Sequence, residues 1–213
     1  MKSKKDVKGI IKILKETYPE AECSLDFSNP FQMAVAVLLS AQCTDARVNI
    51  VTKELFKVGP TAEKMNKLTV EEIEKYIASC GLYKTKAKNI KGLAEMVMNT
   101  YNGEIPDTME ELMKLPGIGR KSANVVMLEA FHNPQGVAID THAKRICNRI
   151  GISKEESPEK IEKDLLKKID KDEYFDANHL CVWHGRYTCK ARKPECERCT
   201  ITKYCNYFKI KNI

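Results

Sequence analysis

The four cysteines near the C-terminus constrain the fold of this chain more than any other feature. They follow one another with the spacing C-x6-C-x2-C-x5-C, and no histidine lies between them. A zinc ribbon brings two separate C-x2-C pairs together, whereas a 4Fe-4S cluster needs one thiolate on each iron and can take all four from one looping segment. The spacing therefore favours a 4Fe-4S cluster over a structural zinc site or disulfides. The predicted ligands are Cys189, Cys196, Cys199 and Cys205.

Five further cysteines are scattered along the chain among apolar neighbours. We interpret each as a small buried hydrophobic residue without chemistry of its own. Residues 1–12 are rich in lysine and lack the apolar run of a signal peptide, so we expect a reducing, cytoplasmic compartment. The five are Cys23, Cys43, Cys80, Cys147 and Cys181.

The chain is basic, with a formal net charge of +7 over 213 residues. Four thiolates around a cluster core of charge 2+ would reduce this to about +5. A basic surface favours nucleic acids or anionic membranes as partners, but no segment approaches the roughly 20 apolar residues of a membrane span. The composition therefore favours nucleic acid as the partner and argues against a membrane.

Apolar residues recur at helical spacing along nearly the whole chain, and no segment alternates with a period of two. The pattern predicts an all-α fold. The segment 30–41 is apolar on every side and is expected to be the central helix, whereas the tail from Thr188 onward shows little helical periodicity and suits a loop around a cofactor. Helices are expected at 6–17, 30–41, 45–57, 70–79, 84–100, 109–114, 120–131, 141–150, 158–168 and 174–183.

The sequence LPGIGRKSANVV, residues 115–126, places Gly117 and Gly119 in a tight turn between two of these helices. Glycine permits such a turn, and the helix that follows then presents N–H groups that bind a phosphate without reading base sequence. An ordinary turn between helices is the alternative. A nucleotide-binding P-loop is disfavoured because that motif has glycine directly before Lys-Ser, where this chain has Arg120.

Two charged residues at predicted helix starts are candidates for chemistry. Lys121 lies in the first turn after the hairpin, where the helix dipole and Arg120 disfavour a cation and push its amine toward the neutral, nucleophilic form. The alternative is a solvated surface lysine. Asp140 directly precedes the predicted helix 141–150, either as its N-cap or as a carboxylate that stabilises positive charge, and both roles are compatible.

Three motifs together resemble the endonuclease III family of base-excision DNA glycosylases, within the helix-hairpin-helix superfamily. They are LPGIGRKSANVV, the segment VAIDTH at 137–142 and the cysteine spacing, and the resemblance extends to LLSAQCTD at 38–45, GLYKTKA at 81–87 and HGRYTC at 184–189. It implies two helical lobes with DNA bound between them. One lobe, 23–133, is a six-helix barrel with the helix-hairpin-helix motif, and the other combines 1–22 with 134–213 and carries the cluster.

The resemblance also implies roles for individual residues. Lys121 would attack the anomeric carbon of the damaged nucleotide and form a Schiff base, and Asp140 would assist it and counter the developing positive charge. Gln42 would fill the gap left by the flipped nucleotide, and Leu82 would wedge into the opposite strand. Further DNA contacts are implied for Gly117, Gly119, Arg120 and His142, and for the cluster-loop residues Lys190, Arg192 and Lys193.

The implied activity is that of a bifunctional DNA glycosylase and AP lyase. Such an enzyme would act as a monomer on duplex DNA with damaged bases or abasic sites, release oxidised or ring-saturated pyrimidines, and cleave 3′ to the abasic site by β-elimination. The adenine- and thymine-mismatch glycosylases share the aspartate and the cluster but lack the hairpin lysine, so Lys121 favours the glycosylase/lyase branch. The alternatives are a mismatch-specific glycosylase and a non-catalytic iron-sulfur DNA-binding protein.

Overall fold

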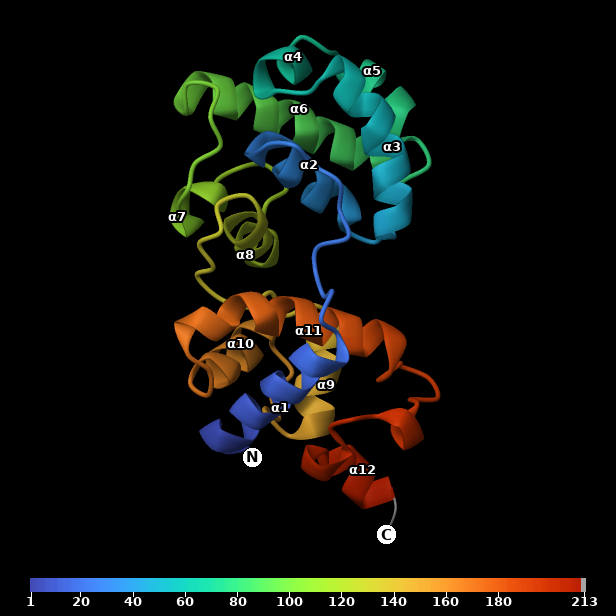
Figure 1. The fold of residues 1–213 in the computed structure, drawn as a ribbon. Coiled ribbons are helices and arrows are strands. Elements are labelled where there is room, and N and C mark those ends of the chain that lie inside the picture. Colours follow the sequence, from blue (N-terminus) through green and yellow to red (C-terminus); the bar gives the residue numbers. More distant parts are fainter. Residues whose placement is uncertain (212–213) are drawn as a thin grey trace. The chain divides into compact units, whose positions relative to one another are not determined.

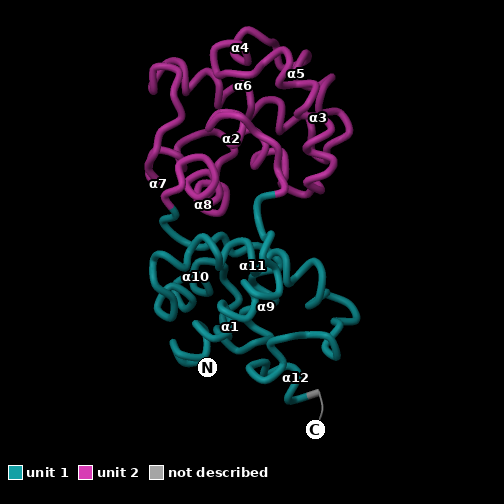
Figure 2. Tube along the Cα trace, in the orientation of Figure 1, with its two compact units in different colours: residues 1–23, 134–213 teal, residues 24–133 magenta. Residues whose placement is uncertain are grey.

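The computed structural model describes residues 1–211, and these residues form an all-α fold, as the sequence predicts (Figure 1). Within them there is no β-strand, and no helix is long and apolar enough to cross a membrane. The chain divides into two compact units (Figure 2). We name residues 24–133 the central unit, and residues 1–23 together with 134–213 the terminal unit.

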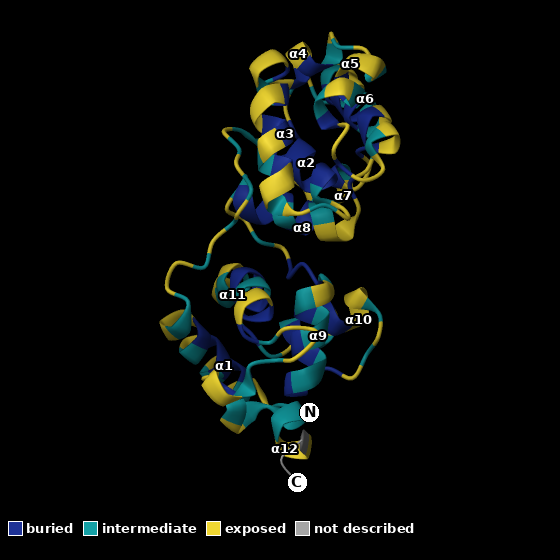
Figure 3. Cartoon of the chain, turned by 90° about the vertical axis from the view of Figure 1, so that its right-hand side faces the viewer, coloured by how far each residue is buried: buried dark blue, intermediate teal, exposed yellow. Residues whose placement is uncertain are grey.

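Helix α2 (Pro30–Ser40) forms the core of the central unit. Its residues from Phe31 to Leu39 are all buried (Figure 3), as expected for a helix that is apolar on every side. It begins at Pro30 because Asn29 Oδ1 accepts a hydrogen bond from the Gln32 N–H at 2.9 Å. The helices α3, α6 and α8 pack against it. The unit also contains α3 (Asp45–Val58), α4 (Ala62–Asn66), α5 (Val70–Ile77), α6 (Tyr83–Thr100), α7 (Met109–Leu112) and α8 (Arg120–Glu129).

Both ends of the chain contribute to the terminal unit. Apolar side chains of its first, second and fourth helices, among them Ile10, Ile146 and Leu180, form one buried cluster. The N-terminal helix therefore helps to fix the helices that carry the candidate site residues. The helices of this unit are α1 (Lys4–Thr17), α9 (Thr141–Ile150), α10 (Pro158–Leu166), α11 (Tyr174–Tyr187) and α12 (Asn206–Lys211).

Helix α11 is longer than the sequence predicts, because it continues to Tyr187 and keeps Gly185 inside it. Glycine normally weakens a helix, yet a side chain at this position would come within 2.7 Å of Cβ and Nδ1 of His142. The close approach of α9 to α11 thus requires glycine.

The prediction of an irregular tail is wrong in part. Two three-residue 3-10 turns, Cys196–Arg198 and Thr202–Tyr204, and the short helix α12 lie within it. Each 3-10 turn is closed by an i to i+3 hydrogen bond from the N–H of the cysteine that follows it, at 3.2 Å for Cys199 and 3.0 Å for Cys205. Turns of this length are too short to produce a helical period in the sequence.

Candidate functional site

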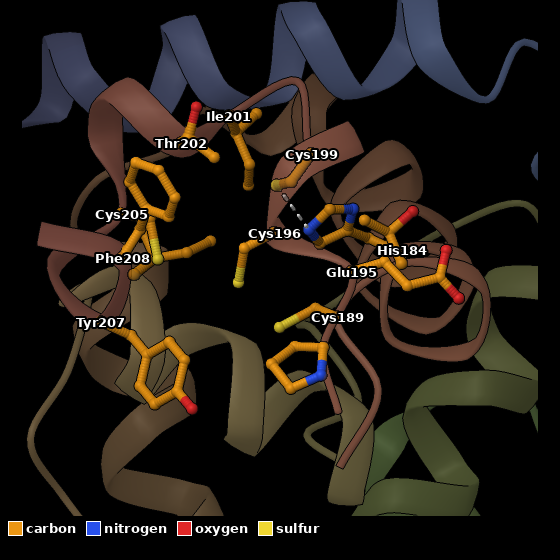
Figure 4. Close-up of a pocket in the computed structure, with 13 residues that line it drawn as sticks. His184, Cys189, Glu195, Cys196, Cys199, Ile201, Thr202, Cys205, Tyr207 and Phe208 are labelled. Carbon is orange, nitrogen blue, oxygen red and sulfur yellow. Dashed lines mark hydrogen bonds between the residues drawn. The ribbon is translucent and has the colours of Figure 1, made fainter. Parts of the chain in front are cut away.

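The four predicted cluster ligands line one pocket of the terminal unit (Figure 4). Cys189 lies just after α11, whereas Cys199 and Cys205 each end a 3-10 turn. Much of the remaining wall is apolar, with Ile150, Ile201, Tyr207 and Phe208. Chain segments far apart in sequence therefore enclose a cavity that is lined by four cysteine side chains.

The spread of these cysteines fits a cluster better than a single zinc ion. Four ligands of one tetrahedral zinc, each about 2.3 Å from the metal, would hold their sulfurs about 3.8 Å apart. Among residues 1–211, no three histidine, cysteine, aspartate or glutamate side chains are close enough together to hold one metal ion. The cysteines instead surround a cavity, as is needed when each sulfur binds a different iron. Burial raises the pKa of the Cys199 and Cys205 thiols, so binding of the irons releases protons.

Two arginines of α9 hold the main chain around this pocket. Arg149 donates from Nη1 to Lys190 O at 2.7 Å and to the sulfur of Cys189 at 3.4 Å, and from Nη2 to Ala191 O at 2.9 Å. Arg145 donates from Nε to Cys189 O at 2.9 Å. Neither arginine was predicted from the sequence to belong to the site. Their spacing of four, which places them on one helix face, is the signal that could have found them.

His184 is a third residue of the site that was not predicted from the sequence. It is buried in α11, with Nδ1 3.1 Å from the Tyr18 hydroxyl and Nε2 3.8 Å from the sulfur of Cys199. Burial lowers its pKa to about 4, so the imidazole is neutral at pH 7. His184 therefore contributes a neutral polar group beside a cluster ligand.

Asp140 lies in the terminal unit at the start of α9. Its Oδ1 accepts a hydrogen bond from the Ala143 N–H at 2.8 Å, so the predicted N-cap role is confirmed. The carboxylate is half-buried, and so is His142, whose Nδ1 is 3.1 Å from Nη2 of Arg145. One helix thus has Asp140 as its N-cap and carries, further along, the two arginines of the cluster pocket.

The hairpin of the central unit has the geometry that its glycines predict. Gly117 has a φ of +79°, and a Cβ there would come within 2.8 Å of Leu38 Cδ1 on α2, so the turn packs closely against the central helix. Gly119 is the N-cap of α8 and has no side chain to satisfy the N–H groups of the first turn. Lys121 is the second residue of α8 and is exposed.

Gln42 and Leu82 both have backbone conformations that are rare for residues other than glycine. Their φ angles are +54° and +58°, and both side chains are exposed, Leu82 to 61%. A Cβ at Gly81 would lie 3.5 Å from Gln42 O, so the two loops are neighbours in the central unit. Left-handed conformations at exposed non-glycine residues are a feature of functional loops.

The three predicted cations of the cluster loop are all exposed. Lys190 forms an ion pair with Glu195, and this hydrogen bond holds the pKa of Glu195 below its usual value. Lys193 has a positive φ of +50°. Arg192 and Lys193 are therefore better placed than Lys190 to meet an external anion, because the ammonium of Lys190 already has an acidic partner.

Two family profiles match the chain. That of the HhH-GPD superfamily base excision DNA repair proteins matches residues 35–171, and that of the iron-sulfur binding domain of endonuclease III matches residues 189–205, from the first to the last cysteine of the pocket. The proteins called endonuclease III in Synechocystis sp. and in Escherichia coli K12 are 45% and 43% identical to the chain, over 92% and 93% of it and 90% and 93% of their own lengths. This chain belongs to the endonuclease III family.

Solved structures of endonuclease III have the same fold. A trapped endonuclease III–DNA covalent intermediate matches with a TM-score of 0.95 and 42% identity over 100% of both chains, and a non-covalent endonuclease III–DNA complex matches with 0.94 and 42% over 100% and 99%. A thermostable thymine-DNA glycosylase matches with 0.83 and 25% over 97% and 98%. As a member of this family, the chain is a DNA-binding glycosylase with AP lyase activity, and its cofactor is a 4Fe-4S cluster.

Proposed function

We propose that Lys121 is the nucleophile of this enzyme and that Asp140 is the carboxylate that assists it. Support comes from the exposed position of Lys121 in the first turn of α8, directly after the hairpin, and from the half-buried position of Asp140 at the start of α9. The observation that carries the proposal is this exposed lysine in a chain whose fold matches a trapped endonuclease III–DNA covalent intermediate.

In this mechanism the Lys121 amine attacks the anomeric carbon of the damaged nucleotide, and the base leaves. Asp140 counters the positive charge that develops on the sugar, which is where a fixed carboxylate lowers the barrier most. Opening of the sugar ring gives a Schiff base between Lys121 and the deoxyribose. β-Elimination then breaks the strand 3′ to the abasic site, and hydrolysis of the imine frees the enzyme.

The proposed substrate is duplex DNA that contains an oxidised or ring-saturated pyrimidine or an abasic site. The target nucleotide leaves the stack, Gln42 occupies the gap and Leu82 enters the opposite strand. The N–H groups at the start of α8, together with Arg120, His142 and the cations of the cluster loop, contact the DNA. We propose that the protein acts as a monomer, and that it works in the cytoplasm at the nucleoid, as suits relatives from bacteria.

Reductive trapping tests the proposal. Borohydride added during the reaction with an abasic duplex is expected to reduce the imine and leave a stable protein–DNA adduct, and Lys121→Gln is expected to abolish this adduct while the duplex still binds. Lys67→Gln is the matched control, because Lys67 is an exposed lysine paired with Glu63 at the end of α4. Its adduct should form at the unaltered rate. An adduct with Lys121→Gln would show that another amine is the nucleophile.

A further inference from the structure

Cys43 and Cys80, two of the five cysteines outside the cluster pocket, contact each other, a feature that the interpretation of each as a small buried residue did not include. The sulfurs of Cys43 and Cys80 are 3.6 Å apart, and both thiols are reduced. Cys43 follows the end of α2 and is half-buried, whereas Cys80 follows the end of α5 and is 2% exposed. The pair therefore joins the ends of two helices of the central unit.

The main chain on each side of the pair is held in place. The Cys43 N–H donates to Ser40 O at 3.1 Å, and the Cys80 N–H donates to Ile77 O at 2.8 Å. A disulfide has an S–S distance of about 2.05 Å, so the two sulfurs need to approach each other by about 1.5 Å. Rotation of the two side chains and a small movement of the loops supply this distance.

We infer that Cys43 and Cys80 form a reversible disulfide that links the loop of Gln42 to the loop of Leu82. A small-molecule disulfide such as glutathione disulfide is the oxidant. The Cys43 sulfur gives up its proton, attacks glutathione disulfide and releases one glutathione. The Cys80 sulfur then gives up its proton, attacks the mixed disulfide at Cys43 and releases the second glutathione, so that two protein thiols are oxidised and one glutathione disulfide is reduced.

The surroundings of the pair determine which sulfur reacts first. Burial and the hydrogen bond with Cys43 raise the pKa of Cys80 to about 11, and the positive charges of Lys86 and Arg47 only partly oppose this. Lys86 is itself buried and donates to Leu39 O at 2.9 Å, which fixes its position. Cys80 is therefore an enclosed, protonated thiol, and the more accessible Cys43 is the residue that meets the oxidant.

The disulfide would alter DNA binding because the pair adjoins both residues that we propose to enter DNA. Gln42 directly precedes Cys43, Leu82 is the second residue after Cys80, and both have positive φ angles. Drawing the sulfurs together moves these loops, so we expect oxidation to weaken binding of an abasic duplex by about tenfold. This consequence rests on the proposed function, whereas formation of the disulfide does not.

The experiment uses the cluster-loaded protein, whose visible absorption is followed throughout so that only intact cluster is compared. The protein is incubated with glutathione disulfide, the remaining thiols are alkylated, and peptides are mapped without reduction. We expect a peptide that links Cys43 to Cys80, lost on addition of dithiothreitol. Cys80→Ala should stop at a mixed disulfide of glutathione with Cys43, and Cys23→Ala, the matched control, should still give the link.

Binding to a duplex with a stable abasic analogue is measured on the same samples by fluorescence anisotropy. Oxidation should raise the Kd of the unaltered protein about tenfold, and dithiothreitol should restore it, while Cys43→Ala should bind equally well with and without the oxidant. Absence of the linked peptide would overturn the inferred site. A linked protein with unchanged Kd would overturn its effect on DNA. Reduced protein that neither binds nor cleaves abasic duplex would instead contradict the proposed function, and the peptide map would still test the disulfide.

Discussion

Replacing Asp140 by asparagine separates the N-cap role, which the structure shows, from the catalytic role that we propose for its carboxylate. The amide oxygen of asparagine can accept the same hydrogen bond from the Ala143 N–H, which is 2.8 Å long in the structure. Asparagine and aspartate are nearly equal as N-caps, so the free energy of unfolding should change by less than about 0.5 kcal/mol. The negative charge, however, is lost.

The expected loss of activity follows from that charge. Removing one group that stabilises charge in a transition state costs about 2.7–4 kcal/mol, which is a factor of about 10²–10³ in rate. Asp140→Ala should reduce the rate by the same factor. It should also remove the cap, which lowers the free energy of unfolding by about 1 kcal/mol. For a chain of this size, that corresponds to a decrease of about 2–4 °C in Tm.

Single-turnover release of an oxidised pyrimidine, with thermal unfolding measured in parallel, distinguishes the two roles. Ser3→Ala is the matched cap control, because Ser3 Oγ accepts a hydrogen bond from the Asp6 N–H at 3.1 Å at the start of α1. It should lower the Tm without lowering the rate. If Asp140→Asn releases the base within about threefold of the unaltered rate, the carboxylate acts as a cap alone and the electrostatic argument is wrong.

Three other predictions concern the cluster, the hairpin and the N-terminal helix. Cys199→Ala should abolish the visible absorption of the cluster and lower DNA affinity, because ligand binding and folding of the loop are coupled; iron analysis and anisotropy measure this. Gly117→Ala should destabilise the protein by about 2 kcal/mol, because φ is +79° and its Cβ would meet a side chain of α2 at 2.8 Å. Gly119→Ala should lower the free energy of unfolding far less, because no atom lies within 4 Å of the added Cβ. Chemical denaturation measures both variants. Hydrogen bonds from two lysines of α1 lower the pKa of Asp170 from 3.8 to about 2. Its stabilising contribution should therefore be complete above pH 3.8, be lost as the pH falls through 2, and disappear in Asp170→Asn.

Features that depend on neighbouring residues in the sequence were predictable. The N-cap at Asp140 is present, because a cap is a contact between a side chain and an N–H two or three residues further on. The central helix was predicted for a similar reason, since its unbroken apolar run leaves no face for water. The five residues of α4 give too short a pattern to show a period, and this helix was missed.

Features that depend on tertiary contacts were not predictable from the sequence. The contact between Cys43 and Cys80 joins residues 37 positions apart, and each cysteine alone has the pattern of a small core residue. Arg149 has the pattern of a surface cation at the end of a helix, yet its guanidinium reaches main-chain carbonyls 41 and 42 positions away. Such positions become functional candidates only when the fold shows which groups they meet.

Helix α9 connects the pocket of the cluster ligands to Asp140, the carboxylate that we propose assists the reaction. Asp140 is the N-cap of this helix, and Arg149 lies nine residues further on, which is about 14 Å along the axis. Arg145 and Arg149 between them bind the carbonyls of Cys189, Lys190 and Ala191 and the sulfur of a cluster ligand. A cluster that fixes this loop also fixes the acceptors of both arginines and hence the orientation of the helix that presents the carboxylate. Because we propose that Asp140 assists the nucleophile, loss of the cluster should lower activity through the position of Asp140.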